Sequence, residues 1–268
     1  MGKIVAAAAT SHIMMSSHGV EEQAKNVVEG FRRFGRYIQD ARPDVIVCMS
    51  SEHMVNLHLD NMPAFCVGVG DKHMAYGDMD IPKVQVTGHR DFAQSFVQHA
   101  FDNEFDLATS EELLLDHGVM LPLLYANPGM KIPVVVLLTN IMTQPMPSMK
   151  RCVKLAQVLR ETIETLRPEN ERVAVIGTGG LSHWLPPGTG GINEEWDRML
   201  LDVISSGRVE ELYDLSTEEI MEKGGNGGQE IRNWIMMASM VQGRQGRILY
   251  YEAPQSWATG MGSVVMEV

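Results

Sequence analysis

The sequence predicts a single α/β domain over residues 1–268, in which a central, mixed but largely parallel sheet is flanked by helices. Two observations predict this fold class. Continuous apolar runs, rich in β-branched residues, alternate with helical patterns along the chain. No Pro- or Ser-rich linker divides the sequence, and we find no internal repeat.

Seven apolar segments are expected to form the strands of this sheet. The first five lack the polar alternation of a half-exposed strand, which indicates a sheet covered on both faces. The last two close the chain as "RILYYEA" and "GSVVMEV". In chain order the segments are 3–9, 44–49, 63–69, 132–138, 173–177, 247–253 and 262–268.

Five segments between and after these strands have helical patterns. Their alternation with the strands is typical of α/β proteins. A glycine-rich "GGNGG" at 224–228 separates the last helix from the preceding helical region. The predicted helices are 21–40, 89–103, 147–166, 193–206 and 229–242.

Composition excludes several classes of function. The net charge of −12 argues against nucleic acid as a partner, because binding to phosphates needs a basic face. No apolar run is long enough for a signal-peptide core or a membrane span. The three cysteines, Cys48, Cys66 and Cys152, are widely spaced and form no C-x-x-C pair. We therefore expect a cytoplasmic protein with free thiols and no membrane partner.

Three strand-like runs end on a histidine after small polar residues. They are "KIVAAAATSH", "DVIVCMSSEH" and "VAVIGTGGLSH", which end on His12, His53 and His183. Ligands of open α/β sheets bind just outside the carboxyl ends of the strands, so these side chains are expected to meet there. Imidazole is a common metal ligand, although a single histidine at a strand end more often hydrogen-bonds a loop.

A fourth histidine, His117, follows Asp116 in "LLLDHGVMLPLL". In apolar surroundings it could act as an acid or a base, or Asp116-His117 could simply form a turn in which Asp116 caps the next helix. A metal site would also need a carboxylate. Glu230 is attractive because it opens a helix after the glycine-rich break, but an acid there also suits the helix dipole, and 34 acidic residues are available.

Together, the motifs "TSH", "SSEH", "LDHGVMLPL", "GTGGLSH" and "GQEIRNWI" resemble the class III extradiol ring-cleavage dioxygenases, in particular the catalytic β subunit of protocatechuate 4,5-dioxygenase. The resemblance spans nearly the whole chain. It implies that His12, His53 and Glu230 bind Fe²⁺. It further implies that His183 assists deprotonation and O₂ chemistry, and that His117 is an acid/base or substrate-positioning residue.

The implied substrates are O₂ and an aromatic compound, first a carboxylated catechol of the protocatechuate or gallate type. Ser256 and Thr259 would contact the substrate's carboxylate. Uncharged catechols, aminophenols and dihydroxypyridines are further possible substrates. One departure from the family is Glu52, where relatives generally have Asp before the second histidine. The resemblance leaves open whether a small α-type subunit caps the site or the chain forms a homo-oligomer.

Two other classes of function fit parts of the same pattern. Two histidines and a glutamate also suit Zn²⁺ with a bound water, as in a hydrolase. A binding module that kept the fold and lost the chemistry is the other alternative. The presence of all five expected site residues argues against the binding module, and the two additional histidines favour the dioxygenase over the hydrolase.

Overall fold

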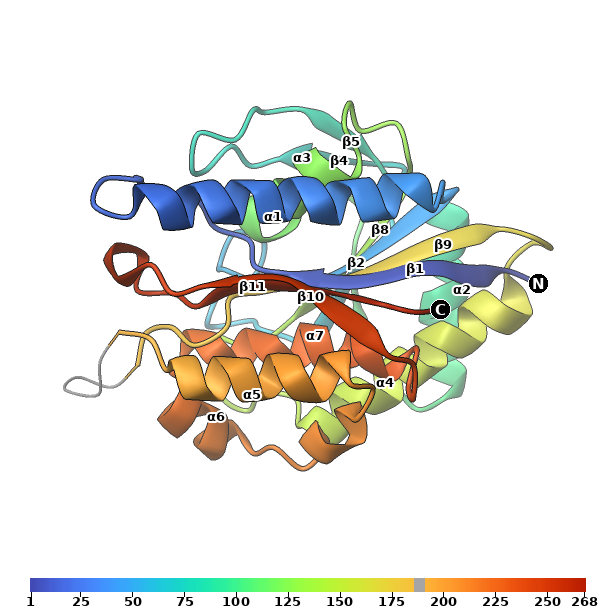
Figure 1. Cartoon of the computed structure of the whole chain (residues 1–268). Helices are drawn as coiled ribbons and strands as arrows, with labels where there is room; N and C mark the ends of the chain where they lie inside the picture. Colours follow the sequence, from blue (N-terminus) through green and yellow to red (C-terminus); the bar gives the residue numbers. More distant parts are fainter. Residues whose placement is uncertain (186–190) are drawn as a thin grey trace.

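The computed structural model describes residues 1–185 and 191–268. Its centre is a mixed eight-stranded sheet (Figure 1). The strands β1, β9, β2 and β8 are neighbours and run parallel, while β11 joins β1 and β3 joins β8 in the antiparallel direction. In spatial order the sheet contains β10 (Gly246–Glu252), β11 (Met261–Met266), β1 (Lys3–Thr10), β9 (Arg172–Thr178), β2 (Val45–Ser51), β8 (Val134–Thr139), β3 (Phe65–Gly68) and β6 (Ala108–Ser110).

Helices cover both faces of the sheet. In Figure 1, α1 and α3 lie on one side, and α4, α5, α6 and α7 lie on the other. Contacts of α1 with α3 and β10, and of α7 with α4 and β9, hold the layers together. The helices are α1 (Glu21–Asp40), α2 (Arg90–Asp102), α3 (His117–Ala126), α4 (Met149–Glu161), α5 (Glu194–Ser205), α6 (Thr217–Gly224) and α7 (Ile231–Ser239).

The first strand shows how the sequence builds this three-layer arrangement. Side chains along a strand point alternately to the two faces of the sheet. In β1, Ala7 and Ala9 pack in the hydrophobic core under α4 and α7, whereas Ala6 and Ala8 pack in the core under α1 and α3. All four alanines are fully buried. A strand that is covered on both faces therefore holds its carboxyl end, and His12 beyond it, in a fixed position.

The predicted α/β fold is confirmed, and each predicted strand and helix is present with its ends shifted by a few residues. The helix α6 was not predicted, and α3 was expected only in the alternative in which Asp116 caps a following helix. The helix α3 lacks an amphipathic period because it is apolar on all sides, and it contains Pro122, a residue that usually interrupts helices.

A small second sheet was also missed. It consists of β5 (Gln85–Thr87), β4 (Lys72–Ala75) and β7 (Leu114–Leu115), in that order. Strands of two to four residues are too short to show a recognisable pattern. Within the described part of the chain, no helix is long and apolar enough to cross a membrane.

Candidate functional site

The carboxyl ends of β1, β2 and β9 meet at one edge of the sheet, and a cavity of about 520 Å³ lies beside them. The loops after these strands carry His12, His53 and His183. All seven residues that the sequence analysis named for the site line this one cavity. They are His12, His53, His117, His183, Glu230, Ser256 and Thr259.

Three of the histidines form a compact cluster. One ring nitrogen from each of His12, His53 and His117 lies within 4.8 Å of the others, an arrangement that could hold a metal ion. The rings of His53 and His117 are stacked with centroids 4.7 Å apart, and the His12 ring meets both edge-on.

A buried carboxylate completes this cluster. Glu230 ends the short turn Gly227–Glu230 that leads into α7, and only 1% of it is exposed. Its Oε1 lies 2.8 Å from His53 Nε2, and its Oε2 lies 3.3 Å from His12 Nε2. The backbone N–H of Gly180 donates to the same Oε2, at 2.5 Å.

Asp116 orients His53. Its Oδ2 lies 2.8 Å from His53 Nδ1, while its Oδ1 accepts a hydrogen bond from the backbone N–H of Gly118 at 2.9 Å. Asp116 therefore caps α3, as one interpretation of the sequence expected, and also directs the Nε2 of His53 toward Glu230. A carboxylate behind a histidine in this way fixes the tautomer and raises the basicity of the opposite nitrogen.

His117 has a partner that sequence reasoning missed. Its Nδ1 lies 2.5 Å from Oδ2 of Asp78. The backbone N–H of His117 also donates to this oxygen, at 3.3 Å. Asp78 lies in a loop 39 residues earlier, and no motif around it marked it as part of the site. The contact leaves His117 Nε2 as the ring nitrogen that can face the cavity.

His183 is oriented by its own loop. Its Nδ1 hydrogen-bonds the backbone carbonyl of Leu181 at 2.9 Å, so Nδ1 carries the proton and Nε2 is free to accept one. The Nε2 atom lies 3.8 Å from Oε2 of Glu230. His183 therefore stands beside the cluster with its basic nitrogen directed to the cavity.

Glycines surround His183 because no larger residue fits. A Cβ atom on Gly227 would lie 1.9 Å from His183 Nε2, and one on Gly180 would lie 2.7 Å from His183 Cε1. In sequence alone, the "GGNGG" segment indicated only a break between helices. The structure shows that one of its glycines allows the backbone to pack directly on the imidazole.

A buried network supports the loop before His183. Asp197 of α5 accepts hydrogen bonds from the backbone N–H of Ser182 at 2.7 Å, from the Ser182 hydroxyl at 2.9 Å and from the Tyr251 hydroxyl at 3.0 Å. Burial raises the pKa of Asp197 to about 6, although the hydrogen bonds from Ser182 act in the opposite direction. This carboxyl group fixes the backbone next to His183 without contacting the cavity.

Glu52 anchors the loop that follows His53. Its Oε1 accepts hydrogen bonds from the backbone N–H groups of Val55, Asn56 and Leu57 at 2.6, 2.9 and 3.3 Å. The Asn56 side chain in turn bonds both the N–H and the C=O of Leu114, just before Asp116. Glu52, the position at which this chain differs from its relatives, therefore belongs to a set of hydrogen bonds. These bonds link the loop after His53 to the segment that carries His117.

The electrostatics of the cluster favour a neutral His12 and an ionised Glu230. Burial lowers the pKa of His12 to about 3, against the attraction of Glu230. Burial alone would raise the pKa of Glu230, but the imidazoles of His12 and His53 outweigh it and hold this pKa well below its usual range. Burial also opposes protonation of His53, yet Asp116 and Glu230 together raise its pKa well above normal.

The donor set fits a divalent metal ion. His12 is a neutral imidazole, and its Nδ1 is buried without a hydrogen-bond partner among the described residues. Glu230 and Asp116 supply two negative charges within contact of the cluster, which a dication would balance. Nitrogen and carboxylate ligands with a position left open suit ferrous iron. All three cysteines are free and buried, and none lines this cavity.

The predicted substrate-binding residues, Ser256 and Thr259, line the same cavity. Thr259 is buried, and its hydroxyl donates to the backbone carbonyl of Trp257 at 3.1 Å. Its backbone forms a β-bridge with His183. Ser256 is exposed and lines the cavity, so both residues are within the site but differ in how freely their hydroxyl groups can meet a ligand.

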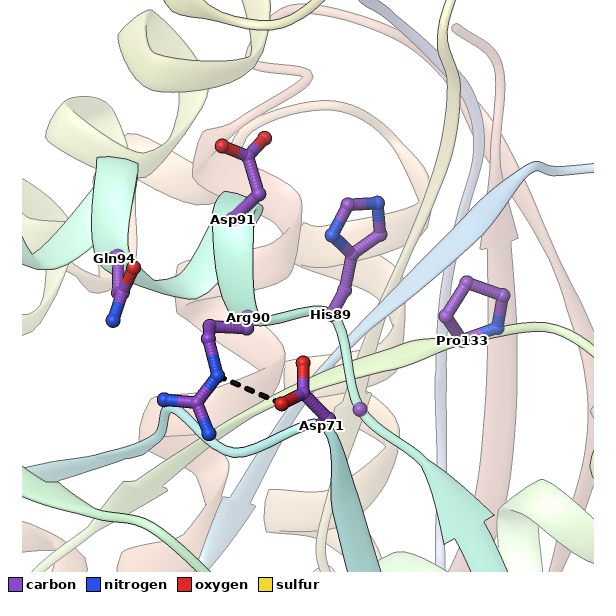
Figure 2. Close-up of a pocket in the computed structure, with 7 residues that line it drawn as sticks. Asp71, His89, Arg90, Asp91, Gln94 and Pro133 are labelled. Carbon is purple, nitrogen blue, oxygen red and sulfur yellow. Dashed lines mark hydrogen bonds and ion pairs between the residues drawn. The ribbon is translucent and has the colours of Figure 1, made fainter.

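A second hollow, shown in Figure 2, lies at the opposite edge of the sheet, near the start of β8. It contains one guanidinium group, Arg90 at the start of α2. That group is already paired with Asp71 at 2.9 Å and with Glu111 at 2.8 Å. The charge of Arg90 is therefore neutralised by carboxylates of the same chain. The histidine cavity remains the better candidate for a functional site.

Fold and site together describe an α/β sheet with a candidate metal site, built from histidines and a carboxylate at the carboxyl ends of parallel strands. Comparison with protein families then identifies the class. Residues 6–262 match the model of the catalytic LigB subunit of aromatic ring-opening dioxygenase. This chain belongs to that family and is an extradiol, aromatic ring-opening dioxygenase of class III.

Relatives with described activities extend over almost the whole chain. The 2,3-dihydroxyphenylpropionate/2,3-dihydroxicinnamic acid 1,2-dioxygenase of Photorhabdus laumondii is 28% identical, with 95% of each chain covered. The enzyme with the same name from a Rhodococcus species is 26% identical, with 96% of each chain covered. A solved structure, that of the uncharacterized protein JW3007 from Escherichia coli K12, has a TM-score of 0.63 at 14% identity and covers 97% of this chain and 100% of its own. This last match shows the fold alone.

Proposed function

We propose that this chain is an Fe²⁺-dependent dioxygenase that opens the ring of a catecholic substrate beside its two hydroxyl groups. The observation that carries the proposal is the contact of one buried carboxylate, Glu230, with the ring nitrogens of both His12 and His53. Two histidines and one carboxylate on one face form the usual ligand set of non-haem Fe²⁺ oxygenases. Bound there, Fe²⁺ would supply electron transfer between an electron-rich aromatic ring and O₂.

The proposal assigns His117 to the substrate rather than to the metal. Its position in the histidine cluster would also allow a three-histidine site, so the two ligand sets must be distinguished by experiment. The resemblance in sequence supports Glu230 as the third ligand. The hydrogen bond that His117 donates to Asp78 holds the imidazole in place to position a substrate hydroxyl or transfer a proton.

His183 is proposed to remove a proton from the substrate and later to return one. Its Nδ1–H is held by the carbonyl of Leu181, so Nε2 is the nitrogen available as the base. Because Gly227 and Gly180 pack against the ring, the imidazole keeps one orientation during the reaction. The base thus stays at a fixed place beside the proposed metal ligands.

The substrate is proposed to be an aromatic ring with two adjacent donor atoms. The relatives named above act on dihydroxylated phenylpropionate and cinnamate, which supports a catechol ring. Catechols of the protocatechuate and gallate type, aminophenols and dihydroxypyridines share this feature. Ser256 and Thr259 are proposed to contact the part of the substrate away from the two donor atoms. A small α-type subunit or a second copy of the chain could cover the cavity.

The test is reconstitution with Fe²⁺ under anaerobic conditions, followed by exposure to O₂ with a panel of catechols, aminophenols and dihydroxypyridines. We expect O₂ uptake and yellow ring-opened products from at least one of them, and none from Zn²⁺-loaded protein. Hydrolytic turnover with Zn²⁺, without O₂ uptake, would overturn the proposal.

The ligand set is tested with two variants of the same chain. We expect Glu230→Gln to lose bound iron, and His117→Gln to keep iron while losing activity. His58→Gln is the matched control, because His58 is exposed and does not line the cavity. Loss of iron from His117→Gln together with retention in Glu230→Gln would instead identify the three-histidine site.

A further inference from the structure

The outer part of the histidine cavity is lined by large apolar side chains. Three of these are unusually exposed for their size: Met15 at 52%, Met79 at 42% and Trp184 at 60%. Exposed apolar surface that gathers at one cavity commonly marks a binding site, because covering it removes it from water. The large apolar residues that line the cavity are Ile13, Met15, Met79, Ile141, Trp184 and Trp257.

The same cavity offers little to a negatively charged group. Among the described residues that line it there is no lysine or arginine. The charged groups in contact with its histidines are the carboxylates of Asp78, Asp116 and Glu230. An anionic substituent in the outer part of the cavity would lose its hydration shell without gaining a lysine or arginine partner, which costs free energy.

Hydroxyl groups do not compensate for the missing cation. Thr259 already donates its hydroxyl proton to the carbonyl of Trp257. Ser256 is the other hydroxyl-bearing residue among those that line the cavity. One neutral hydroxyl is a weak partner for a carboxylate compared with a guanidinium or ammonium group.

We infer that the substrate of this enzyme is a catechol whose ring bears an uncharged apolar substituent, alkyl or aryl. The inference rests on the proposed function, since it assumes that the two ring hydroxyls face the histidine cluster. The substituent would then extend along Met15, Met79 and Trp184 and cover their exposed surface. This departs from the carboxylated catechols that the sequence resemblance suggested first.

The test compares substrates in matched pairs of similar size. The pairs are 3-butylcatechol with 3-(2-carboxyethyl)catechol, and 4-butylcatechol with 4-(2-carboxyethyl)catechol, each given to the Fe²⁺-loaded enzyme. In at least one pair we expect kcat/KM to be about tenfold or more higher for the uncharged member. A binding titration without O₂, followed by quenching of the fluorescence of Trp184 and Trp257, should show the same order without turnover.

A charge placed at the cavity mouth should reduce this preference. Met15→Lys adds a cation to the lining and is expected to raise kcat/KM for the carboxylated member roughly fivefold. Leu59→Lys is the matched control, since Leu59 is 60% exposed and lies outside the lining. It changes the net charge equally and should leave the preference unaltered.

The outcomes separate this inference from the proposed function. If the wild-type enzyme opens catechol rings but prefers the carboxylated member of both pairs, the substituent class is wrong and the ring-opening function stands. If neither member of either pair is opened while catechol itself is, the cavity does not accept a substituent and the inference fails. Absence of ring opening with every compound would remove the proposed function itself.

Discussion

The carboxylate of Asp116 lies 2.8 Å from Nδ1 of His53, on the far side of the ring from Glu230. One imidazole thus joins two buried carboxylates that are far apart in the chain. Asp116 determines which nitrogen of His53 carries a proton, and hence which one is free for a metal ion. Its role can be tested without altering any proposed ligand.

We predict that Asp116→Asn weakens Fe²⁺ binding about 10- to 100-fold. The amide can still cap α3 through its oxygen, but its NH₂ group cannot accept a hydrogen bond from His53. Anaerobic titration with Fe²⁺ measures the effect, with Asp106→Asn as the control because Asp106 is exposed. Unchanged affinity would mean that Asp116 serves only as a helix cap.

We predict that Gly227→Ala lowers kcat by roughly 10²-fold or more while bound iron is retained. The added methyl group would occupy the position of His183 Nε2, so the ring must move away from the cavity. Steady-state kinetics and metal analysis of the same preparation separate the two effects. Gly228→Ala is the control for loss of a glycine: φ is not positive at either position, and a Cβ on Gly228 would meet no atom closer than 3.7 Å.

We predict that Glu52→Ala destabilises the protein by about 1–3 kcal/mol, because three backbone N–H groups lose their shared acceptor. Urea denaturation measures the change in the free energy of unfolding. Glu104→Ala, at an exposed position, is the comparison. Glu52→Asp should lose less than the alanine variant, because a shorter carboxylate can still reach part of this loop; an equal loss would show that side-chain length is decisive.

The stability of the protein should depend on pH through Asp197. Its pKa is raised to about 6, so between the ordinary pKa and pH 6 the folded state holds a proton that the unfolded state releases. Its contribution is therefore fully present below pH ~4 and is lost as the pH rises through about 6, by roughly 3 kcal/mol in total. Asp197→Asn removes this titration. The difference in unfolding free energy, wild type minus variant, should thus fall from pH 4 to 6.5, and a flat difference would contradict the prediction.

The sequence predicted the sheet and the edge that carries the site for a clear physical reason. Strands buried on both faces must be apolar throughout, so β1, β2 and β9 stand out, and the polar residues at their ends are easily seen. His12, His53 and His183 could be placed together from this pattern alone. The choice of Glu230 among the acidic residues needed the family resemblance.

The sequence could not predict which residues far apart in the chain come into contact in the folded protein. Asp78 reaches His117 from a loop without secondary structure, and Glu52 binds backbone groups that carry no sequence signal. The possible cap at Asp116 was the only sign of the helix α3, because this helix is apolar all round and contains Pro122. Such features depend on packing, which single-sequence patterns do not record.

The contacts of His53 also determine when, during folding, the protein could bind a metal ion. Asp116 and Glu230 are 63 and 177 positions away from His53, so the three side chains meet only after most of the chain has folded. Contacts of such high sequence separation form late, since loop-closure entropy must first be overcome. A metal ion would therefore find its full set of ligands only in a nearly complete fold, and a partly synthesised chain would offer it no comparable binding site.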